Sequence, residues 1–137
     1  MEIAKRLDHV AIAADDTQAM VAWYERVLGL TVHAVAGPNS KQKQNAYLIG
    51  PAGGAVKAGM MIEVMPRNDT PRHTRDSHEP GLSHVAWVVS DFDGALAHLR
   101  SQQMRFLSDV LEALGGGRII SFADCEGNMM QIVERKQ

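Results

Sequence analysis

Two histidines in nearly identical settings are the residues of this chain best suited to chemistry. His9 stands in the segment LDHVA and His84 in LSHVA, 75 positions further on. Imidazole is a common metal ligand and changes its charge near neutral pH. One histidine on an apolar strand is more often structural, whereas two at equivalent places favour a shared site that binds a metal ion.

Two further polar residues lie in the apolar segments that close each half of the chain. Glu63 stands in MMIEVM, and Gln131 stands in MMQIVE. An ionised carboxylate among apolar neighbours is costly to bury unless a cation or strong hydrogen-bond donors are near it. Glu63 therefore strengthens the metal hypothesis. Gln131, taken alone, is more typical of a hydrogen-bonding residue in a sheet.

An internal repeat positions these residues. Each copy predicts a strand, an acidic cap at Asp16 or Asp91, an amphipathic helix and three more strands. The first helix is expected over residues 17–28, with Gly29 as its stop signal, and the second is expected to end near Gln103. The later strands are predicted at 30–36, 45–50 and 59–65 in the first copy and at 104–107, 117–123 and 129–134 in the second.

The repeat predicts one domain that is built from two modules. Module 1 covers about residues 5–66, a polar linker without periodicity covers 67–80, and module 2 covers 81–137. A module of this size would bury too little apolar surface alone, so the two are expected to pack together.

Composition limits the kinds of partner. The chain has 137 residues, 45% of them hydrophobic, and 14 basic and 16 acidic residues are mixed along it. There is no basic stripe for nucleic acid and no apolar run long enough to span a membrane. The single Cys125 and the lack of an apolar leader segment favour the cytoplasm. A small-molecule substrate is the expected partner.

Four segments resemble the vicinal oxygen chelate superfamily, which includes glyoxalase I, bleomycin-binding proteins and extradiol dioxygenases. They are LDHVAIAADDTQAMVAWYERVLGL, MIEVM, GLSHVAWVVSDFDGALAHL and SFADCEGNMMQIVE, and the resemblance covers nearly the whole chain. It implies an α+β fold in which two βαβββ modules form a cupped mixed sheet. It also implies one divalent metal ion held by His9, Glu63, His84 and Gln131.

The resemblance implies a metal-dependent lyase or isomerase of glyoxalase or epimerase type. Such an enzyme would act on a small oxygenated metabolite or its thiol conjugate through an enediolate, with Glu63 as the base and zinc, nickel, cobalt or iron as the metal. Many relatives carry glutamate at the place of Gln131, and an amide cannot accept a proton. A metal-free small-molecule binder is the alternative, and a dioxygenase is less favoured because Gln131 replaces a carboxylate of its iron site.

Three further expectations concern assembly and the segment GGGR at residues 115–118. Open sheet edges and apolar helix faces favour a homodimer. The GGGR segment lacks the lysine and hydroxyl residue of a phosphate-binding loop, so it predicts a flexible connection or, less favoured, a lid. Arg118 is a candidate partner for an anionic substrate.

Overall fold

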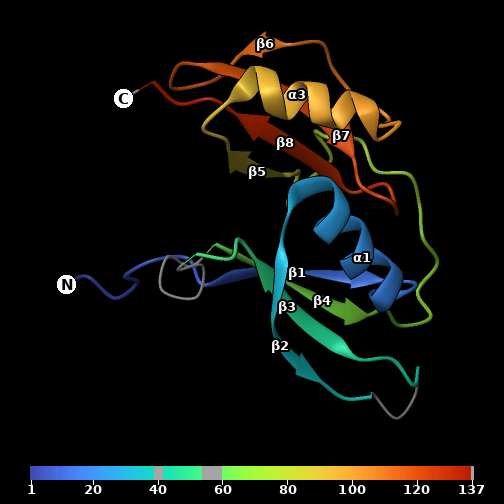
Figure 1. Cartoon of the computed structure of the whole chain (residues 1–137). Helices are drawn as coiled ribbons and strands as arrows, with labels where there is room; N and C mark the ends of the chain where they lie inside the picture. Colours follow the sequence, from blue (N-terminus) through green and yellow to red (C-terminus); the bar gives the residue numbers. More distant parts are fainter. Residues whose placement is uncertain (39–41, 54–59, 137) are drawn as a thin grey trace. The chain divides into compact units, whose positions relative to one another are not determined.

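The same order of elements occurs twice along the chain. The computed structural model describes residues 1–38, 42–53 and 60–136, and the chain divides into two compact units, Met1–Pro71 and Arg72–Gln137. Each unit is a strand, a helix and three strands (Figure 1). The predicted α+β fold of two βαβββ modules is therefore confirmed. Gly59 and Gln137, at the ends of predicted segments, lie outside the described residues.

The first unit is a four-stranded mixed sheet with one helix. Its elements are β1 (His9–Ala14), α1 (Thr17–Leu28), β2 (Thr31–Ala36), β3 (Ala46–Gly50) and β4 (Met61–Pro66). The strand order is β1-β4-β3-β2, with β1 and β4 parallel and the other pairs antiparallel. The register places Ala11 beside Glu63, and Leu48 lies on the other side of Glu63.

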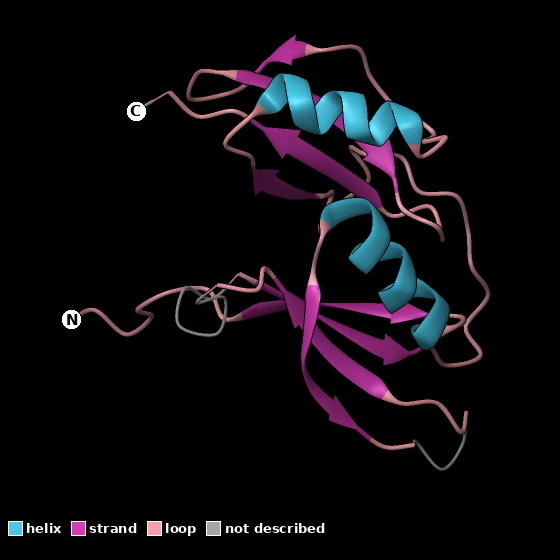
Figure 2. Ribbon diagram, viewed as in Figure 1, coloured by secondary structure: helices cyan, strands magenta, loops and turns pink. Residues whose placement is uncertain are grey.

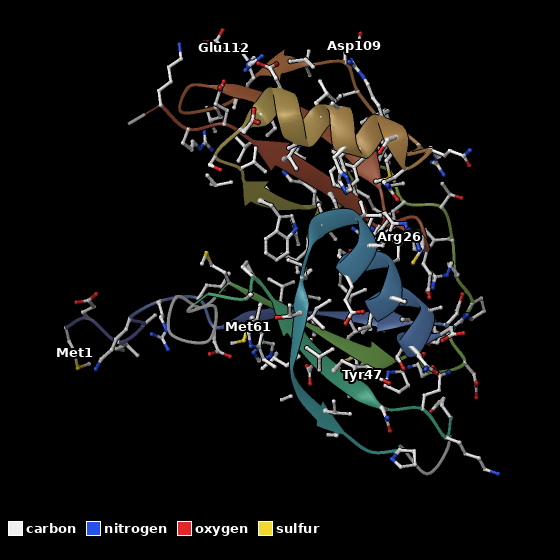
Figure 3. The ribbon with its side chains drawn as sticks, viewed as in Figure 1. Met1, Arg26, Tyr47, Met61, Asp109 and Glu112 are labelled. Atoms are coloured by element: carbon white, nitrogen blue, oxygen red, sulfur yellow. The ribbon has the colours of Figure 1, made fainter. Side chains whose placement is uncertain are left out.

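The second unit repeats this topology. Its elements are β5 (Val85–Val88), α3 (Phe92–Ser101), β6 (Leu111–Glu112), β7 (Arg118–Ala123) and β8 (Met129–Val133). The order is β5-β8-β7-β6, again with a parallel pair between the first and last strands. Ala86 lies beside Gln131, as Ala11 lies beside Glu63 in the first unit. Figure 3 shows Glu112 on β6, the edge strand of this sheet.

Strand alternation decides which side chains form each core. One face of the first sheet packs against α1, which contacts β3 and β4 (Figure 2). The fully buried strand residues of this unit include Ile49, Ile62 and Val64, and the helix contributes Met20, Val21, Trp23, Tyr24 and Val27. In the second unit the buried residues include Phe92, Leu96, Leu99, Ile120, Phe122, Met130 and Ile132. Successive strand residues point to opposite faces, so Glu63 lies on the face opposite to Ile62 and Val64.

The predicted helix signals are confirmed. Asp16 caps α1 by accepting a hydrogen bond from the Ala19 amide at 2.9 Å, and Asp91 caps α3 in the same way. Gly29 ends α1 with φ +67, a left-handed conformation that glycine adopts without steric cost. Gln44 provides a further cap, since its side-chain oxygen accepts a hydrogen bond from the Thr17 amide at 2.8 Å. The sequence did not reveal this contact.

Two boundaries in the second unit differ from the prediction. The helix ends at Ser101, because Gln103 adopts φ +56 and cannot continue it. The strand expected at 104–107 is wrong: this segment makes one isolated bridge, between Phe106 and Phe122, and the edge strand lies later, at Leu111–Glu112. The reason is that the Ser121 amide donates to the Ser108 side chain at 3.0 Å instead of to a strand partner.

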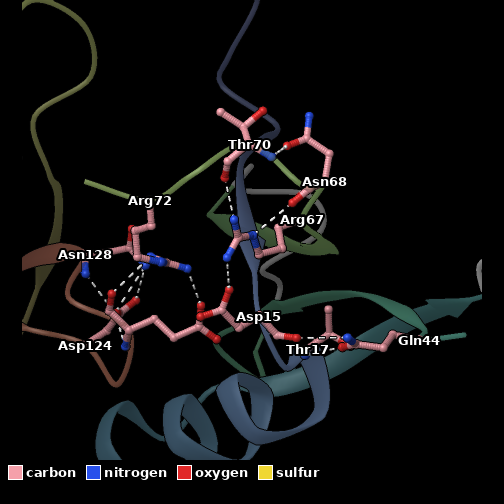
Figure 4. A network of polar contacts seen from close by, with 10 residues as sticks. Asp15, Thr17, Gln44, Arg67, Asn68, Thr70, Arg72, Asp124 and Asn128 are labelled. Carbon is pink, nitrogen blue, oxygen red and sulfur yellow. Dashed lines mark hydrogen bonds and ion pairs between the residues drawn. The ribbon is translucent and has the colours of Figure 1, made fainter. Parts of the chain in front are cut away.

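Two arginines of the segment between the modules form ion pairs. Arg67 pairs with Asp15 at 2.8 Å in the first unit, and Arg72 pairs with Glu126 at 2.8 Å in the second (Figure 4). Residues 67–80 form no helix or strand. In the described ranges, no helix is long and apolar enough to cross a membrane.

The GGG segment forms a turn with defined hydrogen bonds, and its interpretation as a flexible connection stays a prediction. Gly115, Gly116 and Gly117 all have φ between +86 and +91. Arg135 donates to the Leu114 carbonyl at 2.7 Å and to the Gly116 carbonyl at 2.9 Å. A Cβ atom at Gly117 would lie 1.7 Å from the Glu134 carbonyl oxygen, so only glycine fits there.

We expect Gly117→Ala to lower the free energy of unfolding by about 2–5 kcal/mol, from backbone strain plus a steric clash. Gly116→Ala is the matched control, because its φ is +91 but nothing lies within 4 Å of the added atom. The control should cost about 1–2 kcal/mol from strain alone. Urea unfolding of both variants measures the difference. Equal losses of unfolding free energy in the two variants would show that the close approach of Gly117 to Glu134 does not contribute to the cost.

Candidate functional site

The first unit brings His9 and Glu63 together. His9 Nε2 lies 3.7 Å from Glu63 Oε2, and both side chains are 41% exposed. The register explains this contact: His9 is two residues before Ala11, which lies beside Glu63, so both side chains point to the face away from α1. Glu63 is therefore not a buried carboxylate, as its apolar neighbours suggested, because Ile62 and Val64 point into the core instead.

Asp8 holds the other nitrogen of the His9 ring. Asp8 Oδ2 lies 2.7 Å from His9 Nδ1. A carboxylate that accepts a hydrogen bond from Nδ1 leaves the lone pair on Nε2, which is the nitrogen directed at Glu63. This contact is the usual support for a histidine that binds a metal ion.

The second unit repeats the arrangement around His84. His84 is exposed and immediately precedes β5. Ser83 Oγ lies 2.8 Å from His84 Nδ1, at the place that Asp8 occupies in the first unit. The sequence analysis did not identify Asp8 and Ser83 as partners of the histidines. The signal was present in the repeat, since LDHVA and LSHVA differ only at these two residues.

Gln131 lies in a different environment from Glu63. It is 8% exposed, and its Nε2 donates a hydrogen bond to the Ser121 hydroxyl at 3.0 Å. Ser121 is 4% exposed and lies beside Gln131 in the register of β7 and β8. Within the described ranges, no residue donates a hydrogen bond to the Gln131 amide oxygen, Oε1.

The donor atoms of His9 and Glu63 have a spacing suitable for binding one metal ion. Two atoms that ligate one ion at about 2.0–2.2 Å lie about 3–4 Å apart, which the His9 to Glu63 distance of 3.7 Å satisfies. Within either unit, the described His, Cys, Asp and Glu side chains form no group of three that could hold a metal. The joining of His9 and Glu63 with His84 and Gln131 in one site stays a prediction.

Arg118 is already paired within the protein. Its guanidinium contacts Glu134 and Asp93, each at 2.9 Å, and lies 4.7 Å from the centre of the Phe92 ring. The hydrogen bonds from Arg118 lower the pKa values of Asp93 and Glu134, and the two carboxylates raise the pKa of Arg118. The interpretation of Arg118 as an anion-binding residue is therefore not supported.

An open depression of about 610 Å³ lies beside this ion-pair cluster. It is lined by Val110, Leu111, Glu112, Gly117, Arg118, Glu134 and Lys136. None of the four predicted metal ligands lines it. Glu134 belongs to this surface, through its ion pair with Arg118.

The family follows from the match along the chain. Residues 6–132 match the model of the Glyoxalase/Bleomycin resistance protein/Dioxygenase superfamily. The chain belongs to this superfamily, as its repeated βαβββ topology leads one to expect.

Known relatives have diverse descriptions. YaeR of Escherichia coli strain K12, an uncharacterized protein, is 25% identical over 131 residues, which cover 96% of this chain and 97% of YaeR. The trypanothione-dependent glyoxalase I of Leishmania major has a similar fold, with a TM-score of 0.70 and 18% identity over 96% of this chain and 87% of the enzyme. TnmS3, an antibiotic binding protein from Streptomyces, has a TM-score of 0.70 and 18% identity, with 99% of both chains covered.

The Arg118 cluster predicts a pH dependence of stability. Because Arg118 lowers the pKa values of Asp93 and Glu134 in the folded protein, their contribution is present above their ordinary values of 3.8 and 4.5. It is lost as the pH falls through the lowered values. We expect Arg118→Gln to lower the melting temperature at pH 7 and to flatten its decline between about pH 5 and pH 2.

Arg100→Gln is the control for this experiment. Arg100 lies on α3 and carries one positive charge, as Arg118 of β7 does. Thermal melts across the pH range should leave the acid decline of this control close to that of the parent. If both variants show the same acid decline, the ion pairs of Arg118 make no specific contribution.

Proposed function

We propose that this protein is a metal-dependent lyase or isomerase of glyoxalase or epimerase type. Its substrate would be a small oxygenated metabolite or the thiol conjugate of one. The contact of 3.7 Å between His9 Nε2 and Glu63 Oε2 carries the proposal, because it directs an imidazole nitrogen and a carboxylate oxygen to one place. His84 and Gln131 would complete the ligand set from the second unit.

The residues before the two histidines support this assignment. Asp8 and Ser83 each contact the Nδ1 atom of the histidine that follows. Such contacts orient the ring, and where Nδ1 is the donor, Nε2 is left as the ligand atom. Both histidines are exposed, and the contact restrains the ring in each unit.

The donor set suits zinc, nickel, cobalt or iron, because two imidazoles and one carboxylate with an amide oxygen satisfy all four. A bound ion would supply Lewis-acid polarisation of the substrate oxygens. Glu63 would remove the proton from the carbon next to the polarised group. Among the four proposed ligands it is the only carboxylate, and its exposure of 41% leaves it open to a substrate.

Two substitutions test the proposal: one removes the negative charge of Glu63, and the other adds a negative charge at Gln131. Glu63→Gln should weaken metal binding by at least about 100-fold and abolish proton transfer, since it removes the anionic ligand and the base. Gln131→Glu should tighten metal binding, because it adds a second negative ligand. Metal titration of protein purified without a polyhistidine tag measures both effects, and thermal melts check that each variant is folded. A Glu63→Gln protein that binds metal as tightly as the parent would exclude Glu63 as ligand.

A metal-free binder of small molecules is the second candidate. The observation that favours it is the buried contact of Gln131 with Ser121, which satisfies one end of the amide without any ion. The fold likeness to the antibiotic binding protein TnmS3 is compatible with it. On this alternative, the untagged protein would contain no stoichiometric metal, and Glu63→Gln would leave ligand affinity nearly unchanged.

We also propose that the protein acts as a homodimer. Exposed apolar side chains on the edge strands support this, with Val35 of β2 55% exposed and Leu111 of β6 55% exposed. Edge strands that carry exposed apolar residues are ready partners for another chain. Light scattering at about 50 micromolar, where a standard interface normally holds, should give twice the mass of the chain. A monomer mass at that concentration would contradict the dimer.

A further inference from the structure

The edge strands of the two described sheets differ in how well they are protected. β1 and β2 are the edges of the first sheet, and β5 and β6 are the edges of the second. β1 and β5 adjoin the candidate histidines, whereas β2 and β6 are the opposite edges, as Figure 1 shows for β2. An edge strand offers unpaired backbone groups, and proteins usually protect it by a short length or by charged side chains.

β6 has both kinds of protection, and β2 has neither. β6 is two residues long and contains Glu112, with Asp109 shortly before it. β2 is six residues long, has the sequence TVHAVA, and exposes every residue except the half-buried His33. The sequence has no Asp, Glu, Lys or Arg between residues 27 and 40. β2 is therefore an open template for another strand.

A bulge gives β2 one apolar face. Val32 lies beside Ile49 of β3, and Val35 lies beside Tyr47, although regular alternation would put residues 32 and 35 on opposite faces. The bulge between Val32 and Ala34 removes this difference. Ile49 belongs to the fully buried face that packs against α1, so both valines lie on the α1 side of the sheet. They are 36% and 55% exposed, since β2 is the last strand of the sheet.

We propose that two copies of this chain join through β2, in antiparallel pairing about a two-fold axis perpendicular to the sheet. This pairing satisfies the free backbone groups of both strands and joins the two first units in one sheet. A perpendicular axis keeps each face of the sheet on its own side, so Val32 and Val35 of both copies form one apolar strip. The inference rests on the homodimer proposed above and assigns its interface.

The properties of β2 favour a second copy as its partner. A strand that pairs here must be apolar on the α1 side, and β2 itself meets this condition through its two valines. Like charges directly opposite each other destabilise a strand pair, and an uncharged strand avoids them in any register. Pairing of β6 with itself would instead bring two copies of Asp109 and Glu112 to one interface.

Two lysine substitutions at equally exposed residues test the interface. Val35 on β2 and Leu111 on β6 are both 55% exposed in the single chain. Sedimentation velocity over roughly 1–100 micromolar gives the dissociation constant of the dimer. We expect Val35→Lys to raise it by at least about 100-fold, because two positive charges would enter one apolar interface. Leu111→Lys should change it by less than about 3-fold, as for other surface substitutions.

Val35→Thr is the conservative variant, because threonine is uncharged and also suits a strand, and its dissociation constant should stay close to that of the parent. Amide hydrogen exchange is a second measure. In the dimer the β2 amides that face away from β3 should be protected, and in Val35→Lys they should exchange rapidly. Thermal melts check that each variant is folded.

Three results would overturn the inference. A dimer that is unchanged by Val35→Lys, or one that dissociates with Leu111→Lys, would place the interface elsewhere and leave the proposed homodimer intact. A parent that is monomeric over the whole concentration range would exclude the homodimer as well. In that case, protection of the β2 amides only on addition of a different protein would assign this edge to that partner.

Discussion

The parallel pairing of the first and last strands in each unit is the constraint on which the rest of the structure depends. β1 lies beside β4 and β5 lies beside β8, and in each pair an alanine faces the proposed ligand of the last strand. A parallel pair needs a long crossover, which here consists of the helix and two antiparallel strands. The pairing brings His9 next to Glu63, although 53 residues separate them in the sequence.

The same pairing directs alternate side chains of β4 to the core and to the opposite face of the sheet. The side chains of β4 alternate, so Ile62 and Val64 are fully buried while Glu63 remains 41% exposed on the other face. A shift of one residue in register would exchange these faces and place a carboxylate in the core. The apolar packing against α1 therefore fixes the direction of Glu63. Stability of the core and placement of the site are two consequences of one register.

Within this symmetric frame the units have diverged at the residues that contact the proposed ligands. Asp8 in the first unit corresponds to Ser83 in the second, and both contact Nδ1 of a histidine. Leu48 corresponds to Ser121, which pairs with the amide of Gln131. The second difference follows from hydrogen-bond chemistry: a neutral amide needs an acceptor for its NH₂ group, and a carboxylate does not.

The sequence alone determined the elements with strong local signals. Asp16, the apolar period of residues 17–28 and Gly29 act within one helix, so α1 and its ends could be predicted from neighbouring residues. The repeat of LDHVA and LSHVA identified His9 and His84 as candidates, and the apolar segments MMIEVM and MMQIVE identified Glu63 and Gln131. Local patterns could not place the edge strand of the second sheet, because pairing at residues 104–112 depends on Ser108 and β7. Tertiary structure alone revealed the exposure of Glu63, the pairing of Arg118 with two carboxylates and the contact of Ser121 with Gln131. These features join residues that are distant in the sequence, and only the folded register brings them within reach of one another.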